Sequence, residues 1–294
     1  MSPSGAAHPL LLETAMPAPA TRLPAVLFPL LLPLLGACGG DDDKGGAADS
    51  GGATDDGGAA DGGGDDTGGA DGGGDPEAVC TEPAEVACVD ALLLDLSLHD
   101  TISRDGVTNA TDGADFVSVV DASAGGYDQA TRNPWVYVKF TESGLEKVEI
   151  DDESALESMD WDLSLRRFMI RMNGGSSGPS CVGAVTFPET PYAEVAAVPD
   201  GLTWLVDDFY TDDCTIINDS SGLPGSPQLA LGQWWEYPGC VATTNKAHLI
   251  RLADGHVVKV VVETYYAEGQ EGCNTSGVPG SDSGIITLRW QWLE

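Results

Sequence analysis

Apolar and polar residues alternate with a period of two along most of the chain from about residue 116 onward. This alternation is typical of β-strands that bury one face. The strands are short and are separated by residues that favour turns, as in antiparallel β domains. The predicted strands are residues 135–140, 144–150, 182–187, 247–252, 256–266 and 285–293.

A tight turn and one short helix are the other local features that the pattern predicts. Ala253-Asp254-Gly255 lies between two predicted strands and is a strong signal for a β-hairpin. Residues 151–159 combine an acidic first turn with apolar residues at helical spacing, which favours a short helix. The domain is therefore expected to be all-β, with antiparallel strands in a curved-sheet or sandwich-like arrangement and at most one short helix.

The apolar positions within residues 161–173 change faces part-way along the segment. Those up to Leu165 share one parity, whereas those from Phe168 share the other. A shift of one residue moves every side chain of a strand to the opposite face. Keeping both sets in the core would require a β-bulge near Arg166 and Arg167.

The N-terminal residues predict export and lipidation. Residues 23–35 form an apolar run of about 13 positions, which suits a signal peptide and is too short to span a bilayer. Arg22 supplies the preceding positive charge, so Met16 is the better initiator. The run ends in Leu35-Gly36-Ala37-Cys38, which is similar to a lipobox, although an ordinary secretory signal before an unrelated cysteine is the alternative. Lipidated Cys38 would anchor the protein to a membrane.

Composition divides the chain into three parts: a signal peptide at 1–37, a lipidated cysteine with an acidic tether at 38–76, and a β domain at 77–294. The tether consists of Gly, Asp, Ala and Thr, so it has almost nothing apolar to bury and is expected to be disordered. Closely spaced Asp residues also suggest calcium, but the large apolar residues that pack a calcium-binding β-roll are missing.

The formal net charge of −34 limits the possible partners. About a third of this charge lies in the tether, so the β domain is also strongly acidic. Nucleic acid is excluded as a natural partner because its phosphates would be repelled. Anionic lipid headgroups are disfavoured for the same reason, so acyl chains would supply the membrane contact.

Six cysteines remain after Cys38, and an even number in an exported chain predicts three disulfides. Close spacing favours the pair Cys80 and Cys88. Three pairings remain possible among the other four cysteines, which are Cys181, Cys214, Cys240 and Cys273. A zinc site is the alternative, but no CxxC motif is present and no histidine lies at ligand spacing.

Motifs for catalysis are poorly represented. The chain has no GxSxG nucleophile motif, and the glycine-rich residues 174–178 lack the GK[ST] ending of a P-loop. Asp151-Asp152 and Asp207-Asp208 are paired carboxylates, but neighbouring side chains of a strand point to opposite faces and cannot form a dyad. The protein is therefore not expected to be an enzyme.

Several segments together resemble the HmuY family of heme-binding lipoproteins. Trp161-Asp162, the Arg166-Arg167 strand and Asn173-Gly174-Gly175-Ser176-Ser177-Gly178 occur in the family's order, followed by Leu252-Ala253-Asp254-Gly255. The similarity runs from about residue 115 to the C-terminus. It implies an all-β lipoprotein of the bacterial outer membrane, surface-exposed or periplasmic, that holds heme between loops and passes it to a transporter.

The family's heme ligands are two His or Met side chains from loops, and the matching stretches here are residues 204–217 and 234–241. Neither stretch contains His or Met. His248 and His256 lie on two arms of one hairpin. With a three-residue turn they are about 13 Å apart along the strands, and with a two-residue turn they point to opposite faces, so in neither case can they share one iron. Tyr210 and Tyr237 lie in the matching stretches and become the candidate heme ligands.

Two functions remain open. The first is a heme-binding lipoprotein of the HmuY type. The second is a structural or surface-interaction lipoprotein that keeps the fold without heme ligation.

Overall fold

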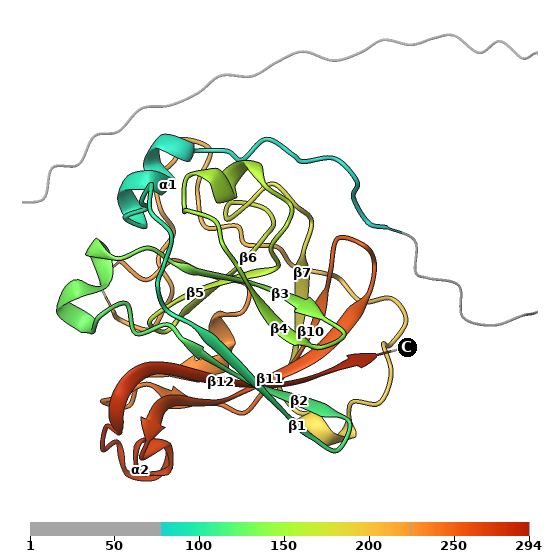
Figure 1. Ribbon diagram of the computed structural model, residues 1–294, viewed down its shortest axis with the longest axis vertical. Helices are drawn as coiled ribbons and strands as arrows, with labels where there is room; N and C mark the ends of the chain where they lie inside the picture. Colours follow the sequence, from blue (N-terminus) through green and yellow to red (C-terminus); the bar gives the residue numbers. More distant parts are fainter. Residues whose placement is uncertain (1–77, 224, 294) are drawn as a thin grey trace, which may run out of the picture. The chain divides into compact units, whose positions relative to one another are not determined.

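The computed structural model describes residues 78–223 and 225–293 (Figure 1). The predicted signal peptide, Cys38 and the predicted tether lie outside the described residues. Antiparallel strands account for most of the regular secondary structure of the described chain, which confirms the all-β prediction.

The larger sheet has six strands in the order β1-β2-β12-β11-β10-β7, and all its neighbours are antiparallel. The alternation of apolar residues along these strands explains the sheet, because it places one apolar face against the core. The strands are β1 (Val107–Asp112), β2 (Asp115–Asp121), β7 (Gly183–Phe187), β10 (Ala247–Arg251), β11 (Val257–Glu268) and β12 (Ser281–Leu293).

A second antiparallel sheet has four strands in the order β4-β3-β5-β6, and a third has only two. Apolar side chains from the larger sheet and the four-stranded sheet form one buried cluster, which includes Val138, Leu165, Val260 and Trp290. The four-stranded sheet consists of β3 (Val136–Thr141), β4 (Gly144–Val148), β5 (Leu163–Arg166) and β6 (Met169–Met172), and the small sheet of β8 (Trp235–Glu236) and β9 (Ala242–Thr243).

Two α-helices of seven residues each exceed the predicted maximum of one short helix. Leu92 of helix α1, and Leu96 directly after the helix, pack on the outer face of the four-stranded sheet in a second buried cluster with Trp135. Residues 151–159, where a short helix was predicted, contain only a 3₁₀ turn. The helical elements are α1 (Val89–Asp95), α2 (Gln270–Ser276) and the 3₁₀ turns η1 (Tyr127–Arg132), η2 (Ser154–Glu157), η3 (Tyr192–Glu194) and η4 (Gly232–Trp234).

The predicted β-bulge at Arg166 and Arg167 is wrong, because the chain reverses there. Leu163 pairs with Met172 and Arg166 pairs with Met169, so β5 and β6 form a hairpin with a two-residue turn. Arg167 adopts a positive φ of 56° in this turn, and its guanidinium donates to the Ser283 carbonyl at 2.6 Å. The reversal accounts for the change of parity.

The second hairpin agrees with its prediction. His248 pairs with Val260 across β10 and β11, and Leu252 donates its backbone N–H to the His256 carbonyl at 2.8 Å. Ala253-Asp254-Gly255 therefore forms the three-residue turn.

The structure contains three disulfides, as predicted, but the pairing of Cys80 with Cys88 is wrong. Residues 80–88 form an irregular segment that contains no helix or strand before α1. Its two ends are tied to different loops, and proximity in sequence therefore misled the prediction. The bonds are Cys80–Cys181, Cys88–Cys214 and Cys240–Cys273.

Candidate ligand-binding cleft

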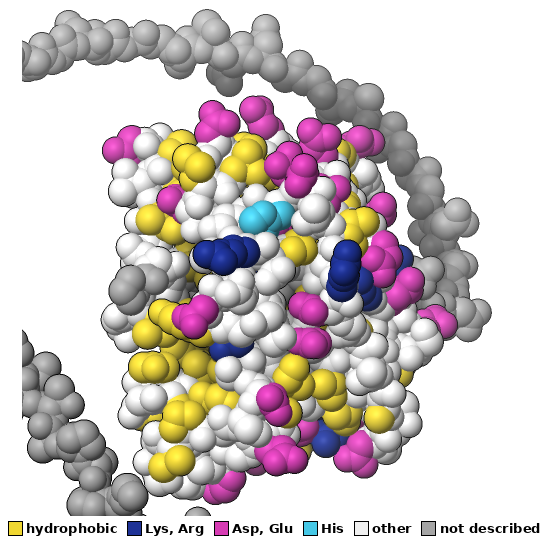
Figure 2. Space-filling model, turned by 60° about the vertical axis from the view of Figure 1, so that its left-hand side comes forward, with side chains coloured by type: hydrophobic (Ala, Val, Ile, Leu, Met, Phe, Trp, Pro, Cys, Tyr) yellow, Lys and Arg dark blue, Asp and Glu magenta, His cyan; other side chains and the backbone are white. Residues whose placement is uncertain are grey.

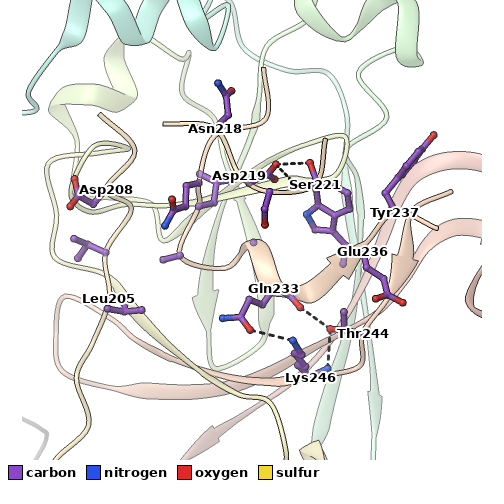
Figure 3. A pocket seen from close by; sticks show the side chains of 17 residues that line it. Leu205, Asp208, Asn218, Asp219, Ser221, Gln233, Glu236, Tyr237, Thr244 and Lys246 are labelled. Atoms are coloured by element: carbon purple, nitrogen blue, oxygen red, sulfur yellow. Dashed lines mark hydrogen bonds between the residues drawn. The ribbon is translucent and has the colours of Figure 1, made fainter. Parts of the chain in front are cut away.

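A cleft of about 930 Å³ lies among four loop segments of the C-terminal half (Figure 3). Its volume falls in the range of about 300 to 1,000 Å³ that is usual for small-molecule sites. The cleft includes parts of both stretches in which the sequence predicts a ligand site. Its lining comes from residues 205–208, 218–221, 228–237 and 244–246.

A buried carboxylate holds two walls of the cleft together. Asp207 is fully buried between two lining residues and accepts hydrogen bonds from the backbone N–H of Met172 at 2.9 Å and of Ala230 at 2.9 Å. The Ser177 hydroxyl donates to the same carboxylate at 2.6 Å. Burial raises the pKa of Asp207, whereas these hydrogen bonds and Arg171 favour the ionised form.

The glycine-rich residues 174–178 support the same wall, as a structural loop. Gly175 has a positive φ of 61°, and a Cβ there would lie 2.0 Å from the backbone oxygen of Asp207. The neighbouring Ser176 donates its backbone N–H to that oxygen at 2.7 Å. Only glycine permits this approach, so the loop fixes the position of the 205–208 segment.

The polar lining is mostly acidic. Asp208, Asp219 and Glu236 line the cleft, and Lys246 is the one cationic side chain among its described lining residues. Lys246 donates to the Gln233 side-chain oxygen at 3.2 Å, which holds the ammonium at one end of the cleft (Figure 3).

Apolar and aromatic side chains are unusually accessible in the same place. Leu205 is 55% exposed, Val206 is 39% exposed and Tyr237 is 47% exposed. In Figure 3, Tyr237 lies on the opposite side of the cleft from Leu205. Trp235 forms part of the floor and packs on Phe168, with ring centroids 4.7 Å apart. Exposed apolar groups that converge on a concave site are typical of ligand pockets.

The structure does not bring the two candidate tyrosines together. Tyr237 lines the cleft, whereas Tyr210 is buried elsewhere and donates its hydroxyl to Asp95 of α1 at 3.0 Å. Burial, and then this hydrogen bond, raises the pKa of Tyr210. Tyr210 therefore stays protonated and serves packing against α1.

None of the described histidines or methionines lines the cleft. His248 is buried in β10 with its Nδ1 3.0 Å from the Thr186 hydroxyl, and His256 lies beside Asp254 at the hairpin. Met169 and Met172 belong to β6. Because the cysteines of the described chain are all in disulfides, Tyr237 is the one described lining residue of a type that ligates heme iron.

Each pair of neighbouring carboxylates has one buried member, although neither pair lies in a strand. Asp152 and Asp207 are fully buried, whereas Asp208 is exposed. Within residues 78–223 and 225–293, no cluster of three or more His, Cys, Asp or Glu side chains could hold a metal ion.

Comparison with known proteins decides the family. Residues 131–276 match the family model described as HmuY protein. The β domain belongs to the HmuY family. The match is shorter at both ends than the predicted similarity, which ran from about residue 115 to the C-terminus. Proteins of the HmuY family are binding proteins of a heme-binding type rather than enzymes. No curated protein sequence matches the chain.

Solved structures of HmuY-like proteins show low similarity to this chain. A protein of Bacteroides vulgatus described as HmuY-like and heme-binding is 19% identical, with 61% of this chain and 93% of that chain covered and a TM-score of 0.38. A Bacteroides fragilis protein described as a lipoprotein is 17% identical, with 62% and 92% covered and a TM-score of 0.38. The apo HmuY analog of Tannerella forsythia is 14% identical, with 67% and 98% covered and a TM-score of 0.33. The family match, rather than these similarities, carries the assignment.

In the described part of the chain, no helix is both long and apolar enough to cross a membrane.

Proposed function

We propose that the protein is an exported lipoprotein that captures heme in this cleft, with Tyr237 as the one axial ligand to the iron. The observation that carries the proposal is the position of Tyr237. It is half exposed on a cleft of suitable volume, within the 234–241 stretch in which the sequence resemblance predicts a ligand loop.

The lining fits heme in three respects. Leu205, Val206 and Trp235 supply apolar surface for a flat macrocycle. A tyrosine is an established type of heme ligand. Lys246 is placed by Gln233 and can pair with one carboxylate of the cargo.

The acidic groups fit less well. Heme carries two carboxylates, and Asp208, Asp219 and Glu236 repel them. One axial ligand and an acidic rim together imply weaker binding than a pair of His or Met ligands would give. This same observation favours the second candidate function, a surface-interaction lipoprotein that keeps the HmuY fold without heme.

Lipidation of Cys38 and the tether at 38–76 complete the proposal. A tether of that length would hold the β domain some 35 Å from the lipid, at about 5 to 6 Å times the square root of residue number. Such a distance suits an outer-membrane lipoprotein, surface-exposed or periplasmic, that meets its cargo in solution and transfers it to a transporter.

Hemin titration tests the proposal. The exported chain with intact disulfides should give a saturable shift of the Soret band, and Tyr237→Phe should weaken binding by at least about tenfold, or about 1.4 kcal/mol. Tyr210→Phe is the matched control, because that hydroxyl bonds to Asp95 away from the cleft. The absence of a saturable shift would overturn heme capture and leave the second function, whereas equal binding by Tyr237→Phe would overturn the role of Tyr237 as the ligand.

A further inference from the structure

A second, smaller concavity of about 580 Å³ lies between the N-terminal segment 83–93 and the η2 turn. We call it the acidic groove. Val86, Leu93 and Leu156 supply its apolar surface, and the exposed side chains of Glu85, Glu153 and Glu157 border it. It shares no lining residue with the heme-sized cleft, and no Lys or Arg is among its described lining residues.

The first half of the wall formed by residues 83–93 is held in place by covalent bonds on either side of it. Cys80 is bonded to Cys181 and Cys88 to Cys214, so two disulfides bracket the start of this wall. Between them, Ala84 donates its backbone N–H to the Pro179 carbonyl at 2.7 Å. The groove is therefore shaped before any partner arrives, which lowers the entropy cost of binding.

Apolar surface continues along helix α1, which forms part of this wall. Val89 lines the groove and is 37% exposed, and Leu94 is 80% exposed further along α1. Large apolar side chains gathered at the surface mark interaction sites more often than isolated ones do. On the face drawn in Figure 2, hydrophobic side chains lie at the surface among Asp and Glu side chains.

Charge decides which occupant suits this groove. The chain's own residues 38–76 are acidic and rich in Gly, so they offer neither a large apolar side chain nor an opposite charge. A second copy of this chain, with its net charge of −34, and an anionic lipid surface would both be repelled by the three glutamates.

We propose that the acidic groove docks a cationic segment of a partner protein, with one or two large apolar side chains in the groove and Lys or Arg beside the glutamates. One wall of the groove, residues 83–93, lies outside the stretch that matches the HmuY family, and the groove shares no lining residue with the proposed heme cleft. Opposite charges at the rim speed association and select the partner, and the apolar contact holds it.

A synthetic peptide with a Leu-Leu centre and two lysines on each side is the probe. It should bind the full exported chain and shift backbone amide signals of residues 83–93 and 153–157 in NMR spectra, with affinity that falls as salt rises. The same peptide with glutamates in place of lysines should not bind.

Paired variants test the site. Glu153→Gln with Glu157→Gln should weaken binding of the lysine peptide by about five- to tenfold, whereas Glu142→Gln with Glu146→Gln, on exposed residues elsewhere, should leave it unchanged. Equal binding by both double variants, or no binding by the wild type, would overturn the proposal. Three other outcomes would also overturn the proposal: self-association of the chain through the acidic groove, occupation of the groove by residues 38–76, or binding of the groove to anionic vesicles. Hemin binding reports separately on the cleft.

Discussion

Asp207 offers the sharpest test of how the cleft is built. One carboxylate oxygen accepts from the Ala230 N–H, and the other accepts from both the Met172 N–H and the Ser177 hydroxyl. In Asp207→Asn, the single carbonyl oxygen can replace only one of these two oxygens. The arrangement that keeps two bonds turns the amide N–H₂ toward Ala230, so that contact becomes donor against donor.

The expected loss for Asp207→Asn is about 2 kcal/mol, because one hydrogen bond to a charged group contributes about 1.5 to 3 kcal/mol. Asp207→Ala removes all three bonds and should cost about 3 to 5 kcal/mol, the usual range for disrupting a buried charged network. Asp208→Asn is the matched control. Its side chain is exposed, so a change within about 0.5 kcal/mol is expected.

Urea denaturation followed by tryptophan fluorescence, with the disulfides intact, measures these differences. Hydrogen exchange at the Ala230 amide should also become faster in Asp207→Asn, since its acceptor is lost. If Asp207→Asn were as stable as Asp208→Asn, the carboxylate would not be what joins the two walls.

Two buried titratable groups and the disulfides give further tests. Burial raises the pKa of Asp162 to about 7. The folded protein then holds this proton more tightly than the unfolded chain, so stability should fall as the pH rises from about 4 to about 7. Asp162→Asn should flatten that slope in urea titrations, and an unchanged slope would refute the assignment. Burial, and then Lys246, lowers the pKa of His248 to about 4, so its ring NMR signals should stay those of the neutral form down to about pH 5. A midpoint near 6.5 would contradict this. A disulfide that closes a longer loop removes more entropy from the unfolded chain. Replacing the Cys88–Cys214 pair, 126 residues apart, by Ala should therefore cost about 5 kcal/mol, and replacing the Cys240–Cys273 pair, 33 residues apart, about 4 kcal/mol. The reverse order in thermal unfolding would contradict this dependence on loop length.

Much of the fold could be predicted because strand periodicity is a local signal. The hairpin at 253–255 and its register follow from the turn residues and from alternation on either side. The turn after β5 was missed because Arg167 adopts its positive φ without the Gly or Asn that usually marks such a position. Hydrogen bonds from its guanidinium to Ser283 accompany that conformation, and this contact is distant in sequence.

The site depended on long-range contacts that local patterns do not contain. Nothing local in the sequence distinguishes Tyr210 from Tyr237. The Tyr210 hydroxyl donates a hydrogen bond to Asp95, which lies 115 residues earlier in the chain, whereas the Tyr237 hydroxyl does not. Alternation correctly predicted that Asp207 and Asp208 face opposite ways. Which of them is buried follows from the glycine loop at 174–178, which packs on the Asp207 backbone.

If Tyr237 alone ligates heme iron in the cleft, electron paramagnetic resonance of the ferric hemin complex should show it. We expect a high-spin signal, which is typical of a single tyrosinate ligand, and this signal should be lost or altered in Tyr237→Phe and retained in Tyr210→Phe. A low-spin signal typical of two His or Met ligands, or a spectrum that Tyr237→Phe leaves unchanged, would contradict it.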